Sequence, residues 1–104
     1  MDPFGPGCDA VALSVGADQA VDNAANADGF LVGAILNPGT AASTLTIKKN
    51  NGGSNLAVLV GVANGSSVVW QPNWAPSYSG AAPALSYTLA GTGATGFLYY
   101  KKRH

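Results

Sequence analysis

Residues 29–49, GFLVGAILNPGTAASTLTIKK, hold two strand-like segments separated by one turn. The first, 29–36, is apolar at nearly every position, which is typical of a strand covered on both faces, so we expect it in the centre of a sheet. The Asn-Pro-Gly-Thr sequence that follows predicts a turn. The second segment, 44–49, alternates between polar and apolar residues, so we expect Leu45 and Ile47 to point inward.

Further strand patterns follow along the chain, separated by stretches rich in Gly, Asn, Pro and Ser. They cover residues 10–15, 56–63, 66–71, 85–89 and 97–102. Together with the two segments above they give seven candidate strands at short spacing. We find no long helical stripe and no alternation of strands with helices. The pattern therefore predicts an all-β domain, an antiparallel β-sandwich or a jelly-roll-like barrel.

Turn chemistry suggests how these strands connect. Asn64-Gly65 lies between two apolar runs and is the strongest hairpin signal, because a type I′ turn needs positive φ at both central residues. We expect residues 50–54 to form a flexible hairpin loop and 91–96 to form a hairpin turn. In the predicted strand 56–63, Leu56, Val58, Val60 and Val62 should share one face.

The first part of the chain differs from the rest. We divide the sequence into 1–28, an acidic N-terminal arm with a first strand, and 29–104, the β-sandwich body. Residues 16–29 lack an apolar stripe, so we expect a loop or arm there, although Asp18 could cap a helical turn. Phe4, in a Pro- and Gly-rich segment, could anchor an arm that adds a strand to a neighbouring subunit, unless that segment is disordered.

Charge is scarce and unevenly placed. Only 10% of the 104 residues are charged, and the formal net charge is zero. All five acidic residues precede residue 29, whereas the five basic residues follow residue 47. A surface with few charges loses little on desolvation, which suits contact between proteins. The asymmetry could steer a partner or set the direction of an assembly.

Residues suited to chemistry are few. His104 is the only histidine and ends the sequence, and the carboxylates all lie in the first segment, so we expect no enzyme and no catalytic residue. One Cys and one His do not make a zinc site, and the spacing of the Asp residues fits no EF-hand, so we expect no metal or cofactor. Gly91, Gly93 and Gly96 match the glycine spacing of a dinucleotide-binding loop. That loop leads from a strand into a helix, whereas residues 91–96 should join two strands, so we do not expect this site.

Other partner classes also find little support. The basic residues 101–103 make a small electrostatic footprint, so we expect no nucleic acid. Met1–Gly7 lacks the features of a signal peptide, and no apolar run is long enough to cross a membrane, so we expect no membrane partner.

Aromatic residues mark the connection 70–80. We expect Trp70 to lie in the core. Trp74 and Tyr78 could close one end of the sandwich, anchor a subunit interface, or form a platform on which a sugar stacks. The candidate interface residues are Phe4, Asp9, Trp74, Tyr78, Lys101, Lys102 and Arg103.

Two stretches carry a resemblance to a known family. They are GFLVGAILNPGTAASTLTI at 29–47 and LSYTLAGTGATGFLYY at 85–100. Their strand, turn and hairpin style resembles the capsid decoration (cement) proteins of tailed bacteriophages, whereas residues 1–28 find no match. The resemblance implies a virion protein on the capsid surface, a homo-oligomer, commonly a homotrimer, that binds the major capsid protein. The alternatives are a head-fibre or receptor-binding domain that recognises host glycans, and a tail or connector component.

Under this hypothesis the N-terminal segment reaches neighbouring subunits. We expect its removal to weaken capsid binding while the body from residue 29 stays folded. A site repeated many times over a capsid lattice binds strongly even where each contact is weak.

Overall fold

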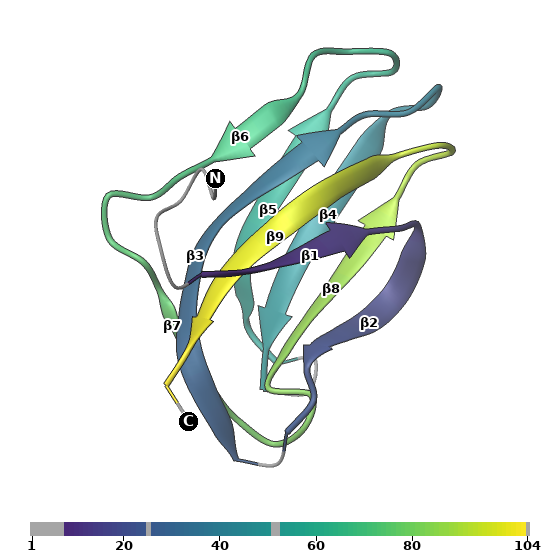
Figure 1. Ribbon diagram of the computed structural model, residues 1–104. Helices are drawn as coiled ribbons and strands as arrows, with labels where there is room; N and C mark the ends of the chain where they lie inside the picture. The colour runs from purple at the N-terminus through teal and green to yellow at the C-terminus, as the bar shows by residue number, and fades with distance from the viewer. Residues whose placement is uncertain (1–7, 25, 51–52, 104) are drawn as a thin grey trace.

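Alternating inward and outward side chains sort the chain into two antiparallel sheets that face each other (Figure 1). The computed structural model describes residues 8–24, 26–50 and 53–103, and within these it contains strands and no helix. The strands are β1 (Asp9–Leu13), β2 (Gly16–Asp22), β3 (Ala27–Asn37), β4 (Ser43–Lys49), β5 (Asn55–Gly61), β6 (Val68–Trp70), β7 (Ser77–Gly80), β8 (Leu85–Ala90) and β9 (Thr95–Lys102). The predicted all-β sandwich is confirmed.

The two sheets differ in the way they are assembled. One has the order β1-β9-β3-β6, with β7 also paired to β3, and we call it the β3 sheet. The other has the order β2-β8-β4-β5, and we call it the β4 sheet. The prediction of a central strand at 29–36 is confirmed, because β3 has β9 on one side and both β6 and β7 on the other.

A β-bulge keeps one face of β3 in the core along the whole strand. The register with β9 shifts between Leu31 and Gly33. Leu31, Ala34 and Leu36 are all fully buried, although strict alternation would place Leu31 and Ala34 on opposite faces. The extra residue resets the alternation, so both halves of the strand face the core.

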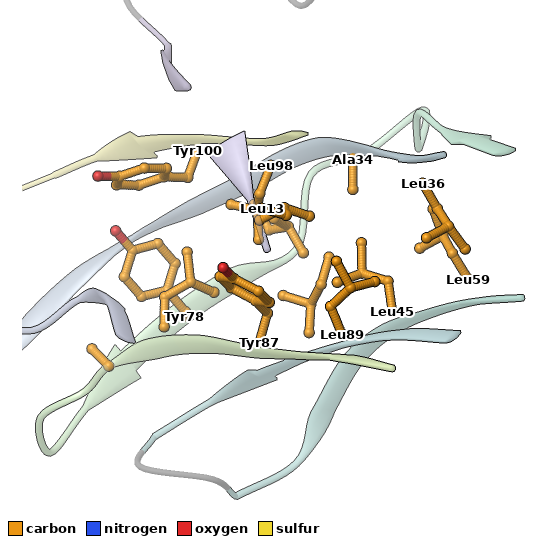
Figure 2. Close-up of a cluster of buried hydrophobic side chains, with 14 of the residues drawn as sticks. Leu13, Ala34, Leu36, Leu45, Leu59, Tyr78, Tyr87, Leu89, Leu98 and Tyr100 are labelled. Carbon is orange, nitrogen blue, oxygen red and sulfur yellow. The ribbon is translucent and has the colours of Figure 1, made fainter. Parts of the chain in front are cut away.

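The core lies between the two sheets and has two chemically different ends (Figure 2). Leu36, Leu45, Leu59 and Leu89 fill one end, and Tyr78, Tyr87 and Tyr100 fill the other. Leu45 and Ile47 are fully buried, as the alternation of 44–49 predicts. Trp70 is partly buried and packs against the core, in line with its predicted place.

The N-terminal segment contributes strands to both sheets, which corrects the prediction of a loop over 16–29. β2 pairs with β8, and β1 pairs with β9. The boundary proposed at residue 28 falls inside β3. Removing residues 1–28 would therefore take away two strands and part of a third, and we no longer expect the remaining body to fold. The predicted arm around Phe4 lies outside the described residues.

Both hairpins predicted from Asn-Gly and Gly-Thr-Gly sequences are wrong. Asn64 does adopt a positive φ of 53°, but β5 and β6 on either side belong to different sheets. Gly91 and Gly93 also have positive φ, yet they carry the chain from β8 in one sheet to β9 in the other. The glycine and asparagine residues form turns as expected. The strands on either side of each turn do not pair with each other, because they belong to the two different sheets that pack face to face. In contrast, β4 and β5 do pair as predicted across the 50–54 loop, of which 51–52 lie outside the described residues.

Of the four apolar residues expected on one face of β5, the three valines point away from the core, whereas Leu56, beside a shift of register, is partly buried and packs against it. Val58 and Val60 are 51% and 67% exposed, and Val62, just beyond the strand, is 72% exposed. Leu59, between the two strand valines, is only 3% exposed and packs in the core. Over residues 57–61 the strand thus places Leu59 inward and its two valines outward.

We predict that neighbouring substitutions on β5 have very different effects on stability. Leu59→Ala should lower the free energy of unfolding by about 2–3 kcal/mol, because it leaves a cavity in the core. Val60→Ala should change it by less than about 0.5 kcal/mol, because surface substitutions cost little. Urea denaturation of both variants checks this, and a larger loss for Val60→Ala would mean that β5 faces the other way.

Candidate interaction surfaces

The structure separates the two aromatic residues that were predicted to act together. Tyr78 on β7 is only 1% exposed, so it closes the end of the sandwich and does not lie on the surface. Trp74, in the connection between β6 and β7, is 82% exposed. Of the two, Trp74 alone remains available for an interface or a ligand.

The Tyr78 hydroxyl joins the two sheets at the tyrosine-rich end of the core. It donates a hydrogen bond of 2.6 Å to Oδ2 of Asp22 at the end of β2, a carboxylate that is itself only 2% exposed. The backbone N–H of Ala24 lies 3.4 Å from Oδ1 of the same carboxylate. A buried carboxylate needs such donors to offset lost hydration, so this pair has a structural role.

Gly29 on β3 makes room for this contact. A Cβ at this position would lie 2.6 Å from the Tyr78 hydroxyl oxygen and would also collide with the carbonyl oxygen of Lys101. Because Gly29 has no side chain, the Tyr78 ring can pack directly against the backbone of β3.

Burial shifts the titration of two tyrosines at this end of the core. The pKa of Tyr78 rises well above its ordinary value, first because of burial and then because of its hydrogen bond to Asp22. The pKa of Tyr100 is also raised, by burial and then by the nearby charges of Asp9 and Asp22. Both tyrosines therefore keep their hydroxyl protons to a higher pH in the folded protein than in the unfolded chain.

The predicted basic residues lie at the end of β9. Lys101 and Lys102 are exposed, and Arg103 follows them. The Arg103 guanidinium lies 3.8 Å from the Asp28 carboxylate and 5.4 Å from the centroid of the Phe30 ring. An exposed ion pair and a cation–π contact of this kind are each weak, but together they fix the direction of this side chain. Asp9, also predicted at the interface, is exposed at the start of β1, where it pairs with Tyr100 in the strand register.

A row of apolar side chains crosses the outer face of the β3 sheet, and we call it the outer row. The strand register places Ala12, Phe97, Ile35 and Val69 directly opposite one another on β1, β9, β3 and β6. Phe97 is 42% and Val69 58% exposed. The Phe97 ring lies 6.5 Å from the ring of Tyr99 on the same strand. The outer row offers a partner an uncharged strip with an aromatic centre.

The outer face of the β4 sheet has a different character. Val58 lies opposite Thr46 and Val60 opposite Thr44, and the row of Thr46 continues to Thr88 on β8. Lys48 forms an ion pair of 3.4 Å with Asp18 of β2 near one end of this face. The surface is therefore mostly threonine and valine, with its ion pair at the end where Lys48 lies opposite Asn55 of β5.

Sequence patterns do not predict the outer row. Phe97, Ile35 and Val69 each lie in an apolar run, so nothing in the sequence separates them from their buried neighbours. Only the strand register, which links residues far apart in the sequence, shows that they share an exposed face. Phe4, the remaining predicted interface residue, lies outside the described residues.

Side chains that could bind a metal ion do not form a cluster in the described part of the chain. Within it, no three His, Cys, Asp or Glu residues lie close enough together to hold a metal ion. The same part of the chain has no helix that is long and apolar enough to cross a membrane. What the described surface does offer is shape, aromatic contact and a small basic end.

Comparison with known proteins found no match among family models, curated proteins or solved structures.

We predict that Tyr78→Phe lowers the free energy of unfolding at neutral pH by about 1–3 kcal/mol, because it removes the hydroxyl group that donates a hydrogen bond to the buried Asp22 carboxylate. Tyr87→Phe is the matched control, since its hydroxyl only accepts a 3.3 Å hydrogen bond from the Ser14 N–H. Chemical denaturation of the two variants checks the difference. An equal loss for both variants would contradict the role assigned to the Asp22–Tyr78 pair.

The raised pKa values also predict loss of stability at alkaline pH. The unfolded chain releases tyrosine protons near pH 10, whereas the folded chain retains them at Tyr78 and Tyr100. This contribution to stability is complete below about pH 9 and declines as the pH rises past about 10. Denaturation at several pH values should show a smaller alkaline decline for Tyr78→Phe than for the unaltered protein. An unchanged decline would show that Tyr78 does not cause it.

Proposed function

We propose that this chain is a structural protein that works by binding other protein surfaces, specifically a decoration protein on the capsid of a tailed bacteriophage. The outer row carries the proposal, because an exposed aromatic and aliphatic surface without charge is suited to protein contact. The resemblance of residues 29–47 and 85–100 to capsid decoration proteins supplies the class of partner, which is the major capsid protein.

The composition of the chain supports this role. Charged residues make up 10% of the chain, and three of the five basic ones, Lys101, Lys102 and Arg103, lie together at the end of β9 and directly after it. Lys101 pairs with Phe30 at the basic end of the β3 sheet, four residues along β9 from Phe97 of the outer row. Positive charge there would orient the protein on an acidic capsid surface, and repeated weak contacts would give firm attachment.

Binding to capsids tests the proposal. The purified protein should cosediment with expanded empty heads from the phage that encodes it, and Phe97→Asp should weaken binding about 30-fold or more by placing a charge in the outer row. Val15→Asp, at a 53% exposed valine outside the outer row, is the control and should bind normally. Failure of the unaltered protein to bind would refute the proposal, and immunogold labelling confined to the tail would favour a connector component instead.

A second candidate function rests on Trp74. A tryptophan that is 82% exposed could stack against a sugar ring, as in a head-fibre or receptor-binding domain. A glycan array separates the two functions. A glycan-binding protein should give signals that Trp74→Ala removes, whereas a decoration protein should give none. Binding to heads that survives Trp74→Ala would place the capsid contact elsewhere.

A further inference from the structure

The free side of β5 is the edge of the molecule most open to strand pairing. Among the described residues, β5 pairs with β4 only, which leaves the other side of its backbone without a neighbouring strand. The strand has seven residues, NLAVLVG, with no charge and no proline. From Ala57 to Gly61 its register with β4 is regular, so this part forms a straight ladder. Such an edge is a template for a further strand.

The other strands at sheet edges carry features that oppose pairing. β2 has the charged residues Asp18 and Asp22 and two shifts of register against β8. β1 begins with the exposed charge of Asp9, and β6 and β7 have only three and four residues. Charge, bulges and short length are the usual protections of an edge strand, and β5 has none of them over 57–61.

We propose that β5 pairs with β5 of a second copy of this chain, in an antiparallel arrangement around a two-fold axis at Leu59. In this register Val58 of one copy lies opposite Val60 of the other, and Leu56 lies opposite Val62. On the inner face Leu59 meets its own copy, and Ala57 lies opposite Gly61. Every pair is apolar, so the strand is complementary to itself, and no charge on it repels the second copy.

The exposed valines give this pairing its energy. Val58, Val60 and Val62 are between 51% and 72% exposed in the single chain, and the second copy would cover part of each side chain. Alternate residues would exchange about two backbone hydrogen bonds each across the new ladder. The two β4 sheets would join into one continuous sheet with an outer face of valine and threonine. Because the contact is two-fold, it closes after two copies and does not extend into a fibre.

The oligomeric state in solution tests this pairing without any capsid, so its failure is distinguishable from failure of the proposed function. Light scattering after size-exclusion chromatography should show a dimer whose fraction rises with concentration. Val60→Lys should lower the dimer affinity at least tenfold, because it places a lysine against Val58 of the other copy. Val69→Lys, a matched change at a 58% exposed valine of the β3 sheet, should leave the dimer intact.

Cysteine cross-linking tests the register. In a Cys8→Ser background, a chain with Val58→Cys mixed with a chain with Val60→Cys should form a disulfide-linked heterodimer under mild oxidation, because directly opposed residues have suitable spacing. Either variant alone should cross-link much less, because residue 58 does not face its own copy. Efficient cross-linking of Val58→Cys alone would overturn the register centred on Leu59.

The remaining outcomes overturn the proposal. A monomer at every concentration would leave this edge to a strand from another protein, and a trimer of the kind that the resemblance implies would not arise from a two-fold contact. A dimer that survives Val60→Lys, or one that Val69→Lys also removes, would place the interface elsewhere. Circular dichroism of each variant should give the spectrum of the unaltered protein, so that loss of the dimer is not loss of the fold.

Discussion

The mutual burial of two sheet faces is the constraint on which the rest of the structure depends. Leu31, Leu36 and Leu98 from one sheet and Leu45, Ile47 and Leu89 from the other are fully or almost fully buried between them. Because side chains alternate along a strand, each inward residue forces its neighbours outward. The residues that pack the core thereby determine the composition of both outer faces, including the outer row and the valines of β5.

The sequence predicts this arrangement well where alternation is strong. Residues 44–49 and 85–89 alternate between large apolar and small or polar side chains, and both form strands as expected. β2 could not be recognised, since most of its side chains are exposed and it is rich in Ala and Asp, residues that strands seldom contain. β7 was missed because Tyr78 is the only large side chain in a short strand that follows Pro76.

The candidate surfaces could be predicted only in part. Alternation shows that Val58 and Val60 share a face but not whether that face is buried. In the structure Leu59, which lies between them, occupies the core in place of the valines. Asn64-Gly65 marks a turn correctly, but the strands that follow a turn choose partners through contacts far away in the sequence. The outer row depends on such pairing, since it joins residues as distant as Ala12 and Phe97.

The neighbouring positions of β1 and β9 have a consequence for engineering. Asp9 pairs with Tyr100, so the start of β1 and the end of β9 lie side by side at the same end of the β3 sheet (Figure 1). A short linker could connect these ends and allow a circular permutant to be opened at an exposed turn such as Thr92. By the same geometry, the domain could be inserted as a unit into a surface loop of an unrelated host protein without separating the two ends of that loop.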